Sequence, residues 1–298
     1  MKKILILVVI VLFSSTLLLA QDDDGFNRNW DNDKNEPKKS QKSNKDKNHL
    51  TSLIETYKPM YVIFGDMKHQ VKIQISFMIP VVYPYKTGLY FGYSQTMIWH
   101  LYSPDNPMAE INFIPEFLWK FQSKNNIANN VDLGVLDYIQ VGFWQHRSNG
   151  EIQTGSKGWD RSYLEIQLSA DIIKQLNIGL NIRGSYIWGT FDNVGNISDN
   201  PDIFEYAGYL ELKVFMKFNK LIPFMSNEEI YMKMKFGSAY GGFDWSKGGR
   251  EYGIKFKALV DWFRPYFFLQ IYEGYGETCI NYNQKVFAIR GGIIFDIF

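Results

Sequence analysis

The stretch Leu210-Glu211-Leu212-Lys213-Val214-Phe215-Met216-Lys217 alternates apolar residues with residues that are mostly charged. In an extended strand, successive side chains point to opposite faces, so this segment has one face suited to hydrocarbon and another that bears charge. The same alternation recurs at 72–79, 230–235 and 254–260. The pattern predicts a series of amphipathic β-strands.

Alternation fits two architectures, because a soluble β-sandwich also alternates but places its apolar face inside. Aromatic residues make up 17% of the chain, which exceeds the need of a soluble core and suits the aromatic girdles of membrane barrels. Beyond the N-terminal segment, no apolar run is long enough for a membrane-spanning helix. We therefore predict an all-β fold, a transmembrane antiparallel β-barrel over residues 50–298, with apolar side chains toward lipid.

The length of the predicted barrel limits its size. About 240 residues, at roughly 20 per strand and turn, give on the order of ten to twelve strands. Such a barrel is narrow, and charged and aromatic side chains would largely fill its interior. A wide open pore is therefore disfavoured.

The N-terminal part of the chain differs from the rest. In residues 1–20, Met1-Lys2-Lys3 precede an apolar run that ends at the small Ala20, which is typical of a secretory signal peptide. Residues 21–49 are rich in Asp, Asn and Lys and almost free of apolar residues. We predict a disordered polar tail there.

Charge and cysteine content exclude some classes of partner and site. The formal charge of +1 becomes −1 once Lys2 and Lys3 leave with the signal peptide (+1 minus 2), which argues against nucleic acid as a partner. Cys279 is the only cysteine. An intrachain disulfide and a cysteine-based metal site are therefore excluded.

One stretch contains the residue types of a serine hydrolase. A serine nucleophile needs a base, and an imidazole base needs a third group to fix its tautomer. His146 and Ser148 would share one face of an extended strand, and a hairpin through the following glycine-rich segment would return Asp160 beside His146. Residues at this spacing also occur as unrelated surface groups.

The alternation predicts where these residues lie. Asp160 shares the parity of Leu164, Ile166 and Leu168, the set expected to face lipid. His146 and Ser148 belong to a mixed set that also contains Tyr138, Gln140, Gly142 and Trp144. If they pair with Asp160, all three residues lie on the outer wall of the barrel, where a catalytic group would meet lipid.

Five blocks of sequence, in the same order, resemble the outer-membrane phospholipase A family of Gram-negative bacteria. The blocks are Lys72-Ile73-Gln74-Ile75-Ser76-Phe77 with Pro80; Gly92-Tyr93-Ser94-Gln95 with Trp99; His146-Arg147-Ser148-Asn149-Gly150 with Ser156, Trp159 and Arg161; Asp199-Asn200-Pro201-Asp202-Ile203 with Tyr206, Gly208 and Tyr209; and Gly274-Tyr275-Gly276-Glu277 with Ile280, Tyr282 and Asn283. The resemblance implies a twelve-stranded barrel in the outer membrane that hydrolyses sn-1 or sn-2 acyl esters of glycerophospholipids and lysophospholipids.

The resemblance also implies roles for single residues. Ser148 would be the nucleophile and His146 the general base, and the amide of Gly150 would stabilise the oxyanion. Asp160 stands where the family has an asparagine that orients the imidazole. An aspartate can accept the imidazole N–H as the asparagine carbonyl does.

Calcium activation of a homodimer is a further implication of the resemblance. Ser156 and the main-chain carbonyl of Glu151 would supply oxygen ligands, with a carbonyl from the loop at Asp105 and Asn106 of the partner subunit, and such ligands suit Ca²⁺. Gln95 matches a glutamine that hydrogen-bonds across the dimer on the lipid-exposed side. A polar residue facing the lumen is an equally open interpretation of Gln95.

The competing hypothesis is a barrel without catalysis, either a narrow channel or a structural protein. Neither would require His146, Ser148, Asp160, Ser156 and Gly150 together. The sequence therefore favours the enzyme.

Overall fold

The structure is a computed structural model. It describes residues 54–65, 70–82, 87–103, 108–122, 135–151, 156–190, 193–194, 200–239, 242–258 and 265–295. The predicted signal peptide, residues 1–20, and the predicted tail, residues 21–49, lie outside the described residues. Within the described ranges, no helix has the length and apolar character needed to cross a membrane.

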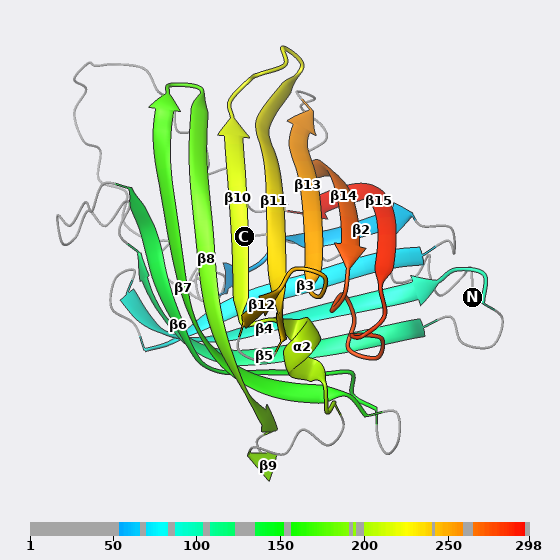
Figure 1. The fold of residues 1–298 in the computed structure, drawn as a ribbon. Coiled ribbons are helices and arrows are strands. Elements are labelled where there is room, and N and C mark those ends of the chain that lie inside the picture. Colours follow the sequence, from blue (N-terminus) through cyan, green and yellow to red (C-terminus); the bar gives the residue numbers. More distant parts are fainter. Residues whose placement is uncertain are drawn as a thin grey trace, which may run out of the picture. The chain divides into compact units, whose positions relative to one another are not determined.

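Twelve strands of the described chain form one antiparallel sheet that closes on itself (Figure 1). Closure is made by β2, which pairs with β15 on one side and with β3 on the other. The strands are β2 (Met60–Gly65), β3 (Gln70–Val82), β4 (Thr87–His100), β5 (Met108–Gln122), β6 (Leu136–Ser148), β7 (Gly158–Ile173), β8 (Leu176–Thr190), β10 (Leu210–Phe218), β11 (Met225–Ala239), β13 (Gly249–Ala258), β14 (Tyr266–Gly274) and β15 (Val286–Phe295). The predicted twelve-stranded barrel is confirmed.

Four short elements of the described ranges lie outside this ring of strands. β1 (Glu55–Thr56) pairs with β3, β9 (Asn193–Val194) with β8, and β12 (Gly242–Asp244) with β11. The helix α2 (Ile203–Ala207) lies at the same end of the barrel as β12 (Figure 1). β6 ends and β7 begins at this end, so α2 lies at the end that carries the predicted catalytic residues.

The two faces of the barrel have the polarity that the sequence predicts. On β10, Val214 and Met216 are 43% and 38% exposed, whereas Phe215 between them is buried. The interior is charged and paired: Arg183 bridges Glu165 and Glu211, and Lys233 binds Glu211. The apolar face is therefore outside, as in a barrel surrounded by lipid.

Charged side chains also limit the internal space. The cavity inside the barrel measures about 450 Å³ and is lined by Lys58, which precedes β2, and by residues of many strands, among them Arg183, Glu211 and Lys235. Ion pairs on the inner wall tie neighbouring strands together, for example Lys213 of β10 with Glu229 of β11. The narrow, largely filled interior agrees with the prediction.

β6 contains two extra residues relative to β7, one between Leu136 and Tyr138 and a second, in the middle of the strand, between Gly142 and Gln145. Gly142 pairs with Tyr163 but Gln145 pairs with Arg161, so the register shifts between these two pairs. A β-bulge of this kind bends the strand and reverses the alternation of its side chains beyond it.

The bulge explains why His146 and Ser148 belong to a set of mixed parity. Before the bulge, Gln140 points inward and its Nε2 donates to Tyr163 Oη. After it, the odd-numbered Gln145 points inward and its Nε2 donates to Glu116 Oε2. Residues 144, 146 and 148 consequently lie on the outer wall, although 138, 140 and 142 have the same parity.

Candidate active site

The end of β6 and the start of β7 bring His146 and Asp160 together. The two residues are direct partners in the register of these strands, and His146 Nδ1 lies 2.8 Å from Asp160 Oδ1. The Asp160 side chain is fully buried, whereas that of His146 is 29% exposed. The hairpin contact expected from the sequence is therefore present.

Trp144 is a third member of this group that sequence reasoning missed. Its indole Nε1 donates to Asp160 Oδ1 at 3.0 Å, and its ring stacks on the His146 ring at a centroid distance of 6.1 Å. Oδ1 thus accepts from two N–H groups, while Oδ2 is buried and has no hydrogen-bond partner among the described residues. The bulge turns Trp144 outward, and no local sequence signal marks that bulge.

Ser148 lies two residues beyond His146 on the same outer face. Its backbone is opposite Gly158 of β7 and Phe113 of β5. A Cβ at Gly158 would lie 3.3 Å from the Ser148 Cβ, so the glycine leaves room beside the hydroxyl. Within the described chain, the imidazole bonds to Asp160 and forms no hydrogen bond to Ser148 Oγ. Catalytic hydrogen bonds often shorten only when substrate binds.

Gly150 follows in a conformation that requires glycine. Its φ is +70°, in the left-handed region that L side chains rarely adopt, and an added Cβ would lie 2.7 Å from the Phe113 ring. The residue is exposed at the end of β6. The backbone N–H of Gly150 therefore belongs to an exposed residue of constrained conformation, two positions after Ser148 in the sequence.

Asn149 fixes both ends of the loop that carries the predicted calcium ligands. Its Oδ1 accepts from the backbone N–H of Glu151 and of Lys157, and its own N–H donates to Lys157 O. Glu151 and Ser156 are thereby held at the two ends of one short loop.

Of the residues predicted to bind calcium, the structure describes Glu151 and Ser156, which offer a carboxylate, a hydroxyl and main-chain carbonyl oxygens. Among the described residues, no cluster of three or more His, Cys, Asp or Glu side chains could hold a metal. The predicted set of a hydroxyl and main-chain carbonyls is compatible with a hard cation such as Ca²⁺. Asp105 and Asn106 lie outside the described residues.

Gln95 lies on the outer wall. The preceding Ser94 points inward, where its Oγ lies 2.9 Å from Ser76 Oγ. Gln95 Oε1 accepts from Tyr93 Oη, and the Tyr93 ring contacts Phe77 on the same side. The Gln95 side chain therefore faces outward and does not point into the lumen.

The inner side of the active-site hairpin packs against α2 and the β14–β15 loop. Trp159, Ile187, Ile203, Cys279 and Tyr282 form a buried cluster. Arg147, between His146 and Ser148, points inward, donates to Glu277 O and lies over the Trp159 ring. These contacts support the hairpin from within the barrel.

The chain is similar to known proteins along most of its length. A family model described as Phospholipase A1 matches residues 29–295. Phospholipase A1 of Escherichia coli strain K12 is 27% identical over 234 residues, which cover 76% of this chain and 70% of that protein. Phospholipase A1 of Klebsiella pneumoniae is 28% identical over 234 residues, which again cover 76% of this chain and 70% of that protein.

Solved structures show the same architecture. Outer membrane phospholipase A from Escherichia coli matches with a TM-score of 0.63 and 23% identity, covering 82% of this chain and 98% of that chain. A Salmonella typhi outer membrane phospholipase, a dimer with bound calcium, matches with a TM-score of 0.62 and 24% identity over 82% and 93% of the two chains. An Escherichia coli active-site mutant with asparagine replaced by alanine matches equally well, with a TM-score of 0.63. At these identities, the likeness shows the shared fold.

Proposed function

Because this chain belongs to the phospholipase A1 family, we propose that it hydrolyses sn-1 or sn-2 acyl esters of glycerophospholipids and lysophospholipids in the outer membrane. Ser148 is the nucleophile, His146 the general base, and Asp160 the group that orients the imidazole. The reaction takes place on the outer wall of the barrel, where the acyl chains of the substrate are present.

The observation that carries this proposal is the hydrogen bond between His146 Nδ1 and Asp160 Oδ1, 2.8 Å long, on the outward face of β6 and β7. With its Nδ1 proton held by the carboxylate, the imidazole keeps its Nε2 lone pair free to accept a proton. A structural barrel or a channel has no need of such a pair on its lipid-facing wall.

The proposed mechanism follows from these positions. Nε2 of His146 removes the proton of Ser148 as Oγ attacks the ester carbonyl, and the Gly150 N–H donates to the resulting oxyanion. The imidazolium, stabilised by Asp160, then protonates the leaving alkoxide. Water, activated by the same base, hydrolyses the acyl-Ser148 ester and releases the fatty acid.

Calcium and pairing of two barrels complete the proposal. The Ser156 hydroxyl and the Glu151 carbonyl would hold the ion, with the loop at Asp105 and Asn106 of the partner subunit. When bound, Ca²⁺ would supply positive charge that stabilises the oxyanion. The Salmonella typhi relative supports this part, since it is a dimer with bound calcium. Gln95 would lie in the interface between the two barrels.

Ester hydrolysis by the detergent-solubilised barrel tests the proposal. Wild type should release fatty acid from a phospholipid in the presence of calcium, and both a chelator and Ser148→Ala should lower the rate at least about a thousandfold. Cross-linking during the assay should show dimers only when calcium is present. Equal rates for wild type and Ser148→Ala would rule out the proposed nucleophile.

A further inference from the structure

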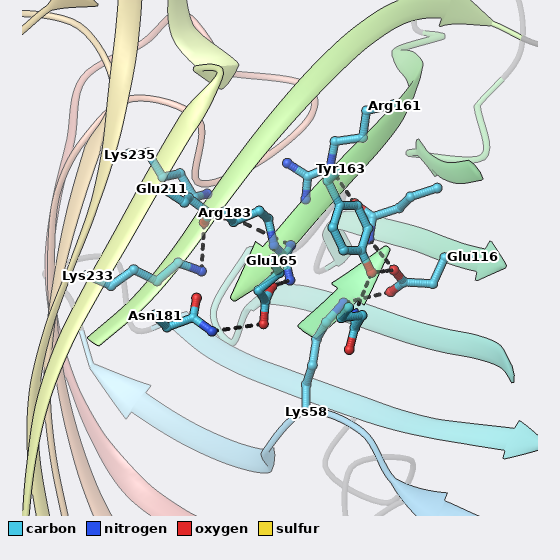
Figure 2. Close-up of polar contacts among 12 residues, drawn as sticks. Lys58, Glu116, Arg161, Tyr163, Glu165, Asn181, Arg183, Glu211, Lys233 and Lys235 are labelled. Atoms are coloured by element: carbon cyan, nitrogen blue, oxygen red, sulfur yellow. Dashed lines mark hydrogen bonds and ion pairs between the residues drawn. The ribbon is translucent and has the colours of Figure 1, made fainter. Parts of the chain in front are cut away.

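A fully buried carboxylate lies directly behind the active-site hairpin. Glu116 of β5 has no exposed surface and accepts hydrogen bonds from three side chains. Lys58 Nζ donates to Oε1 at 3.0 Å, while Gln145 Nε2 and Tyr163 Oη donate to Oε2 at 2.7 and 2.6 Å. Figure 2 shows Lys58 and Tyr163 both reaching the Glu116 carboxylate. The ion pair with Lys58 compensates the charge that burial would otherwise make costly.

Gln145 connects this carboxylate to both strands of the active site. Its Nε2 donates to Glu116, and its Oε1 accepts from Arg161 Nε at 2.5 Å. Gln145 is the residue before His146, and Arg161 is the residue after Asp160. The sequence neighbours of His146 and Asp160 are thus joined to each other on the inner wall through the side-chain amide of Gln145.

The hydrogen bonds of the Gln145 amide affect the register of β6, because Gln145 lies just beyond the bulge. A shift of β6 by one residue would turn Gln145 outward and His146 inward, because side chains alternate across a strand. The shift would place an amide against lipid and would remove one hydrogen bond from a buried carboxylate. The inner network therefore opposes the register in which the catalytic residues would point into the barrel.

We propose that Gln145, held by Glu116 and Arg161, is a positioning residue that fixes the β6 bulge and so keeps His146 and Ser148 on the outer wall. The inference rests on the proposed function, since it concerns the orientation of its nucleophile and base. Gln145 faces the interior and does not touch a substrate on the outside. Its loss should therefore change the rate of the chemical step and leave substrate binding intact.

A matched pair of variants tests this role. Gln145→Leu removes the amide, and Gln270→Leu removes an equally buried amide of β14, on another part of the inner wall. Relative to Gln270→Leu, Gln145→Leu should lower kcat about a hundredfold with KM unchanged, because misplacing a catalytic group by about 1 Å costs that much. The fraction of folded barrel, measured by its gel mobility without heating, should be equal in the two variants.

Exchanging the amide of Gln145 and the carboxylate of Glu116 between the two positions should rescue turnover. Gln145→Glu alone places two carboxylates in contact and should impair turnover, and Glu116→Gln alone removes the charge that binds Lys58. The double variant Gln145→Glu/Glu116→Gln restores an amide-to-carboxylate hydrogen bond and keeps Arg161 paired. It should recover kcat to within about tenfold of wild type, a non-additive result that two independent lesions would not give.

A second readout does not depend on hydrolysis. In a Ser148→Cys background, a lipophilic maleimide in the detergent micelle should label position 148 when Gln145 is present and much more slowly with Gln145→Leu. Cys279 is fully buried and serves as the internal control. If wild type proves inactive, the proposed function fails and this labelling alone decides the inference. Equal labelling and equal kcat in Gln145→Leu and Gln270→Leu would overturn it.

Discussion

Trp144 constrains the orientation that an asparagine side-chain amide could adopt at position 160. An indole N–H is a donor only, and here it donates to the same oxygen that binds His146 Nδ1. An asparagine at this position would therefore have to turn its carbonyl oxygen toward both groups. The amide would then select the same imidazole tautomer as the carboxylate does.

We expect Asp160→Asn to keep kcat within about tenfold of wild type, whereas Asp160→Ala should lower it about a thousandfold. In a Trp144→Phe background the amide is free to turn its NH₂ group toward the imidazole, so Asp160→Asn should become much more harmful there. Steady-state hydrolysis by these variants, with Trp144→Phe alone as control, measures the effect. Similar losses for Asp160→Asn and Asp160→Ala would contradict this role of Trp144.

Among the strands, β10 and β6 show how far alternation predicts structure. On β10 the pattern is uninterrupted, so the sequence correctly assigns Val214 to the outside and Phe215 to the inside. On β6 the bulge between Gly142 and Gln145 reverses the pattern, and the register with β5 and β7 that defines it is not marked by the local alternation. The sequence could therefore predict the His146–Asp160 hairpin contact but not the position of Trp144 or the inner anchor at Gln145.

The β14–β15 loop contains a carboxylate that ties it to two strands. Glu277 binds Lys72 Nζ at 2.9 Å and Arg290 Nη1 at 2.6 Å. Burial alone would raise the pKa of the Glu277 carboxyl, but the two cations outweigh it and lower this pKa to about 2. A depressed pKa in the folded state means that the carboxylate stabilises the barrel fully above pH ~4.3, the value for an unfolded chain.

This stabilisation, about 3 kcal/mol, should disappear as the pH falls from about 4.5 to 2. Thermal unfolding of the barrel at several pH values, followed by gel mobility, should show a steeper acid loss for wild type than for Glu277→Gln. The variant should be less stable at pH 7, because Lys72 and Arg290 then lack their shared partner. Parallel pH profiles for the two proteins would show that Glu277 does not titrate in this way.

For the molecule as a whole, the sequence predicts the main architecture well. The twelve-stranded outer-membrane barrel, the phospholipase A1 family and the class of enzyme are confirmed. Pairing inside the barrel could not be predicted, because Lys and Glu residues on many strands share the same inner wall. Arg183, for example, bridges Glu165 of β7 and Glu211 of β10, and only the closed sheet shows which partners it has.

The central claim is that Ser148 on the outer wall is a nucleophile activated by His146. Mass spectrometry of the barrel after treatment with a long-chain alkyl sulfonyl fluoride tests it most directly, since Oγ would displace fluoride and retain the sulfonyl group. We predict one adduct, on Ser148, whose formation parallels the loss of hydrolysis and which is absent in His146→Ala. Loss of hydrolysis with Ser148 unmodified, or no adduct on an active protein, would contradict the claim.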